Sequence, residues 1–186
     1  MAVMIEGPAG PIEALIDLPP HPPKAIVVFA HPHPQHGGTM HTKAVFQGAK
    51  GLVRAGCGVV RFNFRGIGAS AGAFDEGRGE CDDFSAVVDY AAATWPGLPI
   101  WGAGFSFGAW VALETGSQDA RVSVLMGIAP PVAREGYVFT HVLTSTKPKF
   151  FVQGSLDELC LLKDLWGFYA RLPEPKELAV IDGADH

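Results

Sequence analysis

Ser106 lies at the centre of the stretch Gly104-Phe105-Ser106-Phe107-Gly108, which matches the pattern G-x-S-x-G. In this pattern a tight turn between a strand and a helix lifts a serine hydroxyl above a sheet, where its oxygen can attack a carbonyl carbon. Glycine suits the two outer positions because a Cβ there would collide with the neighbouring strand and helix. The alternative is a glycine-rich turn with an incidental serine. The pattern favours a nucleophilic Ser106.

A serine hydroxyl is a weak nucleophile near neutral pH, so it needs a base within hydrogen-bond reach and a third group that orients the base. After a G-x-S-x-G turn the order along the chain is serine, acid, histidine. Only His141 and His186 follow Ser106. His186 comes directly after the last expected strand and is the expected base, with a solvated terminal histidine as the alternative. His141 lies between two strands and is more simply explained as a surface or packing residue.

The expected acid is Asp157, which lies in the loop just past the expected strand Phe150-Phe151-Val152. Four other carboxylates are near it or near the histidine: Glu158, Asp164, Asp182 and Asp185. The first two are expected on the solvated face of the next helix. The last two are too close in sequence to His186 to orient its ring easily. The order of the groups along the chain therefore favours Asp157.

A negatively charged oxygen that forms during attack needs two convergent backbone N–H groups. One is expected from Phe107, the residue after the serine, and the other from the loop after the apolar run 25–30. Proline has no N–H, so in His31-Pro32-His33-Pro34 the amide of His33 is the suitable donor.

The same loop could be interpreted as a metal site, because it is rich in histidine: His31, His33, His36 and His41. Prolines separate these residues, and no cysteine or carboxylate completes the spacing of a metal site. We therefore expect no metal and no cofactor.

These groups have to be positioned by strands and helices, and the apolar pattern predicts both. Short apolar runs predict strands at residues 12–17, 25–30, 59–64, 99–103, 122–129, 150–152 and 178–181. The residue after the serine motif begins a predicted helix, and three apolar stripes predict others: Val45, Phe46, Ala49, Leu52 and Val53; Phe84, Val87, Val88 and Ala91; Leu162, Leu165, Trp166 and Tyr169. Strands that alternate with helices predict an α/β fold with a mostly parallel, doubly wound sheet, covered on both faces.

Composition limits the class of protein. With 186 residues, of which 48% are hydrophobic, one globular domain over residues 1–186 is expected. The net charge of −5 and the lack of a Lys/Arg cluster argue against nucleic-acid binding. No apolar stretch approaches the ~18 residues of a membrane span, and the N-terminus lacks the features of a secretory signal, so we expect a cytoplasmic protein. Cys57, Cys81 and Cys160 are expected to be reduced, buried thiols.

The sequence resembles the serine α/β-hydrolase superfamily, and is most similar to its small bacterial members without a lid, relatives of dienelactone hydrolases and prolyl-peptidase-type domains. The resemblance rests on five segments that run from residue 31 to the end: His31-Pro32-His33-Pro34 with Gly37-Gly38-Thr39-Met40, Arg61 to Ser70, Gly104 to Gly108, Gly154-Ser155-Leu156-Asp157, and Gly183-Ala184-Asp185-His186. It implies a three-layer α/β/α sandwich.

For the site, the resemblance implies Ser106 as nucleophile, Asp157 as acid and His186 as base, with the amides of His33 and Phe107 as the oxyanion hole. Arg65 matches a turn of the superfamily in which the arginine is structural. Dienelactone hydrolases have a cysteine in place of the serine, which disfavours their substrate chemistry here.

Two departures from the superfamily pattern shape the expectations. Members continue past the histidine into a loop and a final helix, so we expect that a C-terminal helix is missing after His186, with a segment of roughly 20–30 residues. Only the segment 130–148 separates two core strands where a cap domain is inserted in other members. That segment is too short for a helical lid, and we expect an open site without a cap.

The expected activity is hydrolysis of carboxylic esters of small soluble substrates through an acyl-enzyme on Ser106, as in a carboxylesterase, by a monomer or homodimer. Peptides or thioesters could be cleaved by the same three groups. Two further hypotheses stay open. The protein could be a binding protein that keeps the fold with catalytic groups that do not react, or a cofactor-free perhydrolase or haloperoxidase that uses the same residues. Fold analogy alone cannot rank these chemistries.

Overall fold

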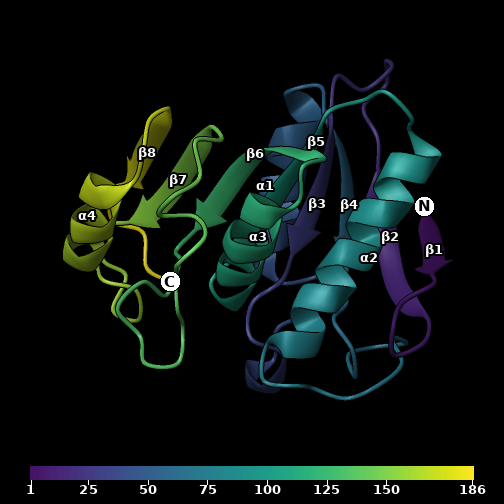
Figure 1. Cartoon of the computed structure of the whole chain (residues 1–186), viewed down its shortest axis with the longest axis horizontal. Helices are drawn as coiled ribbons and strands as arrows, with labels where there is room; N and C mark the ends of the chain where they lie inside the picture. Colours follow the sequence, from purple (N-terminus) through teal and green to yellow (C-terminus); the bar gives the residue numbers. More distant parts are fainter.

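The computed structural model describes residues 1–186 and contains one eight-stranded sheet with the strand order β1-β2-β4-β3-β5-β6-β7-β8 (Figure 1). The strands are β1 (Ala2–Ile5), β2 (Ile12–Asp17), β3 (Ile26–Ala30), β4 (Gly58–Phe62), β5 (Ile100–Phe105), β6 (Val122–Ile128), β7 (Lys149–Gly154) and β8 (Lys176–Ile181). β1 and β2 are antiparallel to their neighbours, whereas β4, β3, β5, β6, β7 and β8 pair in parallel. The sheet is therefore mostly parallel, as the sequence predicts.

Helices cover both faces of the sheet. They are α1 (Lys43–Arg54), α2 (Arg78–Thr94), α3 (Phe107–Gln118) and α4 (Leu162–Arg171), with a short 3-10 turn at Pro34–His36. In Figure 1, α2 and α3 lie in front of the sheet and α1 behind it. The apolar side chains of α2, α3 and α4 join one core cluster, and those of α1 join a second, smaller cluster on the opposite face. The result is a three-layer α/β/α sandwich.

The central strands explain the strongest part of the sequence pattern. Every residue of β3 and β4 is buried, because helices cover both of their faces. β2 alternates between buried and half-buried positions, as expected of a strand near the edge of the sheet. In Figure 1 the parallel strands point downward, and the C-terminus lies near the edge where they end.

Three details differ from the sequence prediction. β1 was not predicted; it pairs with β2 in antiparallel register, and the amino group of Met1 donates to the carbonyl of Ile16. Phe46 and Trp166, placed on buried stripes by the prediction, are 41% and 49% exposed. Phe168 is buried in α4 in place of Trp166, because the face of this helix that meets Phe151 is rotated from the predicted stripe.

No helix or strand forms between β6 and β7, so no helical lid covers the edge of the sheet there. On the α1 side of β6 and β7, Met126, Ile128, Phe150 and Val152 are only half-buried. None of the helices combines the length and the apolar character that crossing a membrane requires.

Candidate active site

Ser106 occupies a strained turn between β5 and α3. Its φ and ψ angles are 54° and −117°, a left-handed region that non-glycine residues rarely adopt. A Cβ on Gly104 would collide with the carbonyl of Gly108, and a Cβ on Gly108 would collide with the carbonyls of Ala30 and His31. Gly104 is therefore needed for close packing of β5 against the start of α3, and Gly108 for close packing of α3 against the end of β3. This arrangement has the geometry that the G-x-S-x-G pattern predicts.

The structure brings together Ser106, His186 and Asp157, which are separated by 80 and 29 residues along the chain. Nδ1 of His186 lies 2.8 Å from Oδ2 of Asp157, and Nε2 lies 3.1 Å from Oγ of Ser106. A carboxylate only accepts, so the ring carries its hydrogen on Nδ1 and Nε2 is free to accept the proton of the serine hydroxyl. The imidazole also packs on the ring of Phe105, with 4.9 Å between centroids.

Asp157 has a fully buried side chain that accepts four hydrogen bonds. Oδ1 accepts the backbone N–H groups of Leu159 and Cys160 at 2.9 and 2.8 Å, and Oδ2 accepts Nε2 of Gln153 at 3.0 Å as well as the histidine. Gln153 also donates to the carbonyl of Cys160. These donors fix the carboxylate in place without a nearby cation. The role of Gln153 could not be predicted from the sequence, because it depends on a turn that folds back onto its strand.

The loops that carry the acid and the base are joined directly. The N–H of Leu156 donates to the carbonyl of Ala184 at 2.9 Å, and Oγ of Ser155 accepts the N–H of Gly183 at 2.8 Å. A Cβ on Gly154 would collide with the carbonyl of Ala184, so glycine is required for this contact. The parallel pairing of β7 with β8 places both loops at the same edge of the sheet. His186 is thereby held beside the acid by backbone contacts two residues before it.

The expected oxyanion donors are both near the serine and unused. Phe107 is the first residue of α3, so its N–H has no acceptor within the helix. The N–H of His33 donates to no backbone carbonyl or side chain of the protein. The rings of His33 and Phe107 lie 5.1 Å apart, and His33 lines the same cleft as Ser106. The amides of His33 and Phe107 therefore stay candidates for the oxyanion hole, since neither has an acceptor within the protein.

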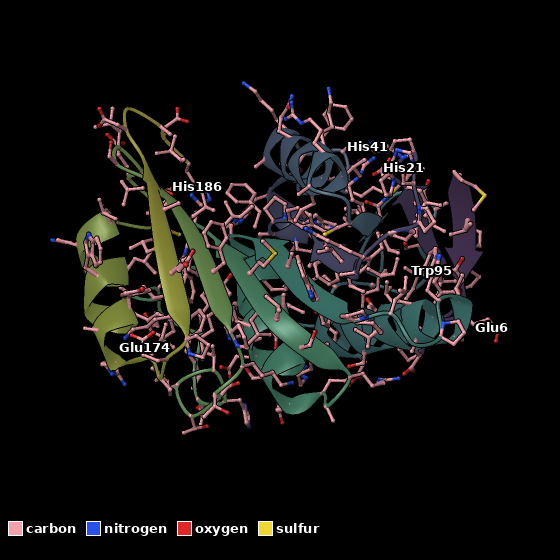
Figure 2. The ribbon with its side chains drawn as sticks, turned by 90° about the horizontal axis from the view of Figure 1, so that it is seen from above. Glu6, His21, His41, Trp95, Glu174 and His186 are labelled. Atoms are coloured by element: carbon pink, nitrogen blue, oxygen red, sulfur yellow. The ribbon has the colours of Figure 1, made fainter.

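His31 positions the loop that carries His33. Its ring is fully buried, Nε2 accepts the N–H of Phe64 at 3.1 Å, and Nδ1 lies 2.6 Å from the carbonyl of Pro32. Burial lowers the pKa of His31 to about 4, so the ring is neutral at neutral pH. Since both ring nitrogens are used by the backbone, His31 cannot join the other histidines of the loop around a metal. His41, the last histidine of this stretch of the sequence, lies far from the expected base His186 (Figure 2).

The donor atoms of Asp157, Cys160 and His186 come within 4.8 Å of one another, a spacing that could hold a metal ion. However, the carboxylate already accepts four hydrogen bonds. Burial, together with the charge of Asp157, raises the pKa of the Cys160 thiol to about 12. A protonated thiol is a poor metal ligand. The arrangement suits acid–base chemistry better than metal binding.

A cleft of about 240 Å³ opens above the serine. Its walls come from five segments of the chain and contain ten residues: Pro32, His33, His36, Phe105, Ser106, Pro131, Arg134, Tyr137, Leu159 and His186. A larger hollow of about 510 Å³ lies between α2, α3 and His141, but none of the three catalytic candidates lines it. The small cleft is therefore the candidate substrate site.

The segment between β6 and β7 supplies one wall of the cleft and is anchored to α3. The carboxylate of Glu114 accepts the backbone N–H groups of Thr140, His141 and Val142, each at 3.1 Å, and lies 2.9 Å from Nδ1 of His141. Nε1 of Trp110 donates to the carbonyl of Val138 at 2.9 Å. His141 is thus an exposed surface residue bonded to Glu114, which agrees with the surface alternative of the prediction. The anchoring carboxylate was not predicted.

Arg65 has the structural role that the resemblance implies. Its side chain makes two hydrogen bonds to the buried carboxylate of Asp83, at 3.0 and 2.8 Å, and its own N–H donates to the same group. This pair ties the loop after β4 to α2.

Comparison with known proteins agrees with this geometry. The sequence profile of the serine aminopeptidase family S33 matches residues 21–149. An uncharacterized protein of Rickettsia prowazekii, RP471, is 34% identical over 191 residues, which span 99% of this chain and 80% of the relative. An alpha-beta serine hydrolase homologue from Coxiella burnetii is 37% identical with a TM-score of 0.93, covering 100% of this chain and 88% of the other.

A second solved structure bears on the missing lid. XC6422 from Xanthomonas campestris, described as an a/b serine hydrolase without lid, is 35% identical with a TM-score of 0.90, and the match covers 100% of this chain and 85% of the other. The profile match extends over more than half of the residues, and these relatives align along the whole chain. The chain therefore belongs to the serine hydrolases of the α/β-hydrolase superfamily, in the S33 family, and is similar to its small members without a lid.

Proposed function

We propose that this serine hydrolase cleaves carboxylic esters of small substrates through an acyl-enzyme on Ser106. The observation that carries the proposal is the hydrogen-bonded chain from Oγ of Ser106 through His186 to the buried Asp157. The serine oxygen attacks the ester carbonyl while Nε2 of His186 takes its proton, and the ring then gives this proton to the departing alcohol. Water, activated by the same nitrogen, releases the acid in the second half of the cycle.

The remaining groups of the site fit the same steps. The charge that develops on the carbonyl oxygen is stabilised by the amides of His33 and Phe107, which are free to donate. Asp157 holds the ring in the tautomer that accepts from the serine and stabilises the imidazolium that forms. A cleft of about 240 Å³ is at the small end for ligand sites, which favours short substrates.

An aminopeptidase activity is the second candidate, because the matching family is described as serine aminopeptidase. An enzyme of that type must hold the positively charged amino group of a peptide. No Asp or Glu lines this cleft, and its one fixed charge is the guanidinium of Arg134. A cationic amino group would be repelled there. The charge distribution favours the esterase over the aminopeptidase.

The proposal is tested with 4-nitrophenyl acetate and butyrate for esterase activity and with alanine 4-nitroanilide for aminopeptidase activity. We expect hydrolysis of the esters, and a fall in kcat of about 10⁴-fold or more in Ser106→Ala. Ser117→Ala is the matched control, because Ser117 lies on the same helix and donates only to the carbonyl of Leu113. Ester hydrolysis that survives in Ser106→Ala would remove the proposal, and faster cleavage of the anilide would favour the peptidase.

A further inference from the structure

The guanidinium of Arg134 lines the candidate substrate cleft without a partner. Arg61, Arg65, Arg78 and Arg121 all form ion pairs with carboxylates, whereas none of the ion pairs or side-chain hydrogen bonds of the protein involves the side chain of Arg134. Its guanidinium is always charged and presents a planar fork of donors that suits a carboxylate. An unpaired arginine in the cleft above the serine is therefore a candidate for binding an anion.

The surroundings of Arg134 do not neutralise it. None of the ten residues that line the cleft is an Asp or Glu. Glu158 and Asp164 line a neighbouring hollow together with Arg134, but neither forms an ion pair with it. Asp157 is buried and already bonded to His186 and to three other donors. The guanidinium of Arg134 therefore borders the cleft above the serine without an ion-pair partner.

His33 adds no second charge beside Arg134 at neutral pH. Burial lowers the pKa of His33, and electrostatic repulsion from His36 and from the guanidinium of Arg134 lowers this pKa further. The ring of His33 is therefore neutral at neutral pH, although it stacks on His36 with 4.4 Å between centroids. The field of the guanidinium also reaches the other wall of the site, where it opposes the rise in the pKa of Cys160 that burial causes.

The segment that carries Arg134 is held in place. The N–H of Arg134 donates to the carbonyl of Pro131 at 3.2 Å, and its own carbonyl accepts the N–H of Tyr137 at 3.3 Å. The ring of Tyr137 packs against Trp110 with 5.5 Å between centroids, and Glu114 fixes the residues that follow. A turn that is anchored in this way loses less entropy when an anion binds.

We propose that Arg134 binds a carboxylate of the substrate, so that the ester cleaved at Ser106 carries a free carboxylate in its acyl or alcohol part. Half-esters of dicarboxylic acids, and hydroxy acids that are acylated on the hydroxyl group, are substrates of this kind. The inference rests on the proposed esterase function and adds the class of substrate to it. The charge attracts the anion and orients the ester, while the reaction at the carbonyl is unchanged.

Two pairs of synthetic esters test the inference and locate the carboxylate. In the first pair the leaving group differs, 4-acetoxybenzoate against the neutral 4-acetoxybenzamide. In the second the acyl group differs, the mono(4-nitrophenyl) ester of adipic acid against 4-nitrophenyl hexanoate. Within each pair, the reacting carbonyl and the size are matched and the charge differs.

We expect kcat/KM of the wild-type protein to be about tenfold higher for the anionic member of at least one pair. A charge-assisted hydrogen bond supports a factor of roughly 10 to 100, and the exposure of Arg134 places the effect at the low end. Arg134→Gln should lower kcat/KM for the anionic ester more than for the neutral ester and so abolish this preference, and Arg134→Lys should keep part of it. Arg171→Gln is the matched control, because Arg171 is also exposed and unpaired but does not line the cleft.

Equal kcat/KM ratios in wild type and Arg134→Gln would overturn the inference. So would an equal loss for both members of a pair, because Arg134 would then only support the loop. A binding measurement separates this inference from the proposed function: the two anionic esters, 4-acetoxybenzoate and the mono(4-nitrophenyl) ester of adipic acid, are each titrated calorimetrically into Ser106→Ala with and without Arg134→Gln. We expect at least one of them to bind about tenfold more weakly to the double variant. Equal binding of both esters to the two proteins would overturn the inference whether or not the wild type hydrolyses esters.

Discussion

Acid should destabilise this protein through a single buried ring, that of His31. The ring is fully buried, and its Nε2 must be unprotonated to accept the N–H of Phe64. Burial lowers its pKa from 6.5 to about 4. In the unfolded chain the ring takes up a proton as the pH falls below about 6.5, whereas in the folded protein it stays neutral until about pH 4. The stabilisation is therefore complete above pH 6.5 and is lost as the pH falls toward 4.

The size of this effect follows from the shift. A difference of about 2.5 pKa units corresponds to a total of about 3 kcal/mol, of which about 2 kcal/mol is lost between pH 7.0 and pH 4.5. His31→Gln places an amide oxygen near the position of Nε2 and does not titrate. We therefore expect His31→Gln to lose about 2 kcal/mol less than the wild type over this pH interval. His31→Leu leaves the N–H of Phe64 without an acceptor and should lose about 1–3 kcal/mol already at pH 7.0.

The assay is urea unfolding at pH 7.0 and pH 4.5, followed by the fluorescence of the four tryptophans. Carboxylates and the other histidines titrate in all three proteins and cancel in the comparison. If the free energies of unfolding of wild type and His31→Gln fell in parallel between the two pH values, the assignment of a neutral, buried His31 would be refuted.

Three further predictions concern the turn, the anchored segment and the thiols. Gly108→Ala should prevent folding or remove activity, because the added Cβ meets the carbonyls of Ala30 and His31. Gly51→Ala is the matched control: this glycine lies in α1 with open space around it, so the variant should raise the free energy of unfolding in urea by about 0.5–1 kcal/mol. Glu114→Gln should lower the free energy of unfolding by about 1–3 kcal/mol, because the amide offers fewer acceptors to the backbone N–H groups of the segment. Glu135→Gln, on the exposed part of the same segment, should leave the free energy of unfolding unchanged. Equal effects of the two variants would contradict the anchoring role of Glu114. All three thiols have raised pKa values, mainly through burial, but only Cys57 and Cys160 are buried as expected, whereas Cys81 is half-buried. Iodoacetamide at pH 8.5 should therefore leave Cys57 and Cys160 unmodified in the native protein and add three groups in urea by intact mass, and rapid native alkylation of Cys57 or Cys160 would show that these two are accessible thiolates.

The sequence was sufficient for the parts of the fold that depend on local pattern. Runs of buried residues marked β3 and β4, and the glycines around Ser106 marked the turn between β5 and α3. β1 was missed because its four residues carry little pattern of their own and are ordered by pairing with β2. The exposed faces of α1 and α4 were misplaced, because the rotation of a helix is set by what it packs against.

The site was predictable as far as chain order constrains it. Ser106, Asp157 and His186 follow the order expected after a G-x-S-x-G turn, and the structure brings their side chains into contact. The supporting residues were not predictable, since their partners are distant in sequence or appear only after a loop folds. Glu114 bonds to residues 26 to 28 positions away, and His31 to an amide 33 positions away. The catalytic roles and the oxyanion hole remain predictions for experiment.

The central claim is that His186, steered by Asp157, makes the hydroxyl of Ser106 nucleophilic. Reaction with a fluorophosphonate probe, followed by peptide mass spectrometry, measures this directly without assuming a substrate. The account predicts one adduct per chain, located on Ser106, and a reaction slower by about 10³-fold or more in His186→Ala. An unmodified Ser106, or labelling of Ser106 at the same rate without His186, would contradict it.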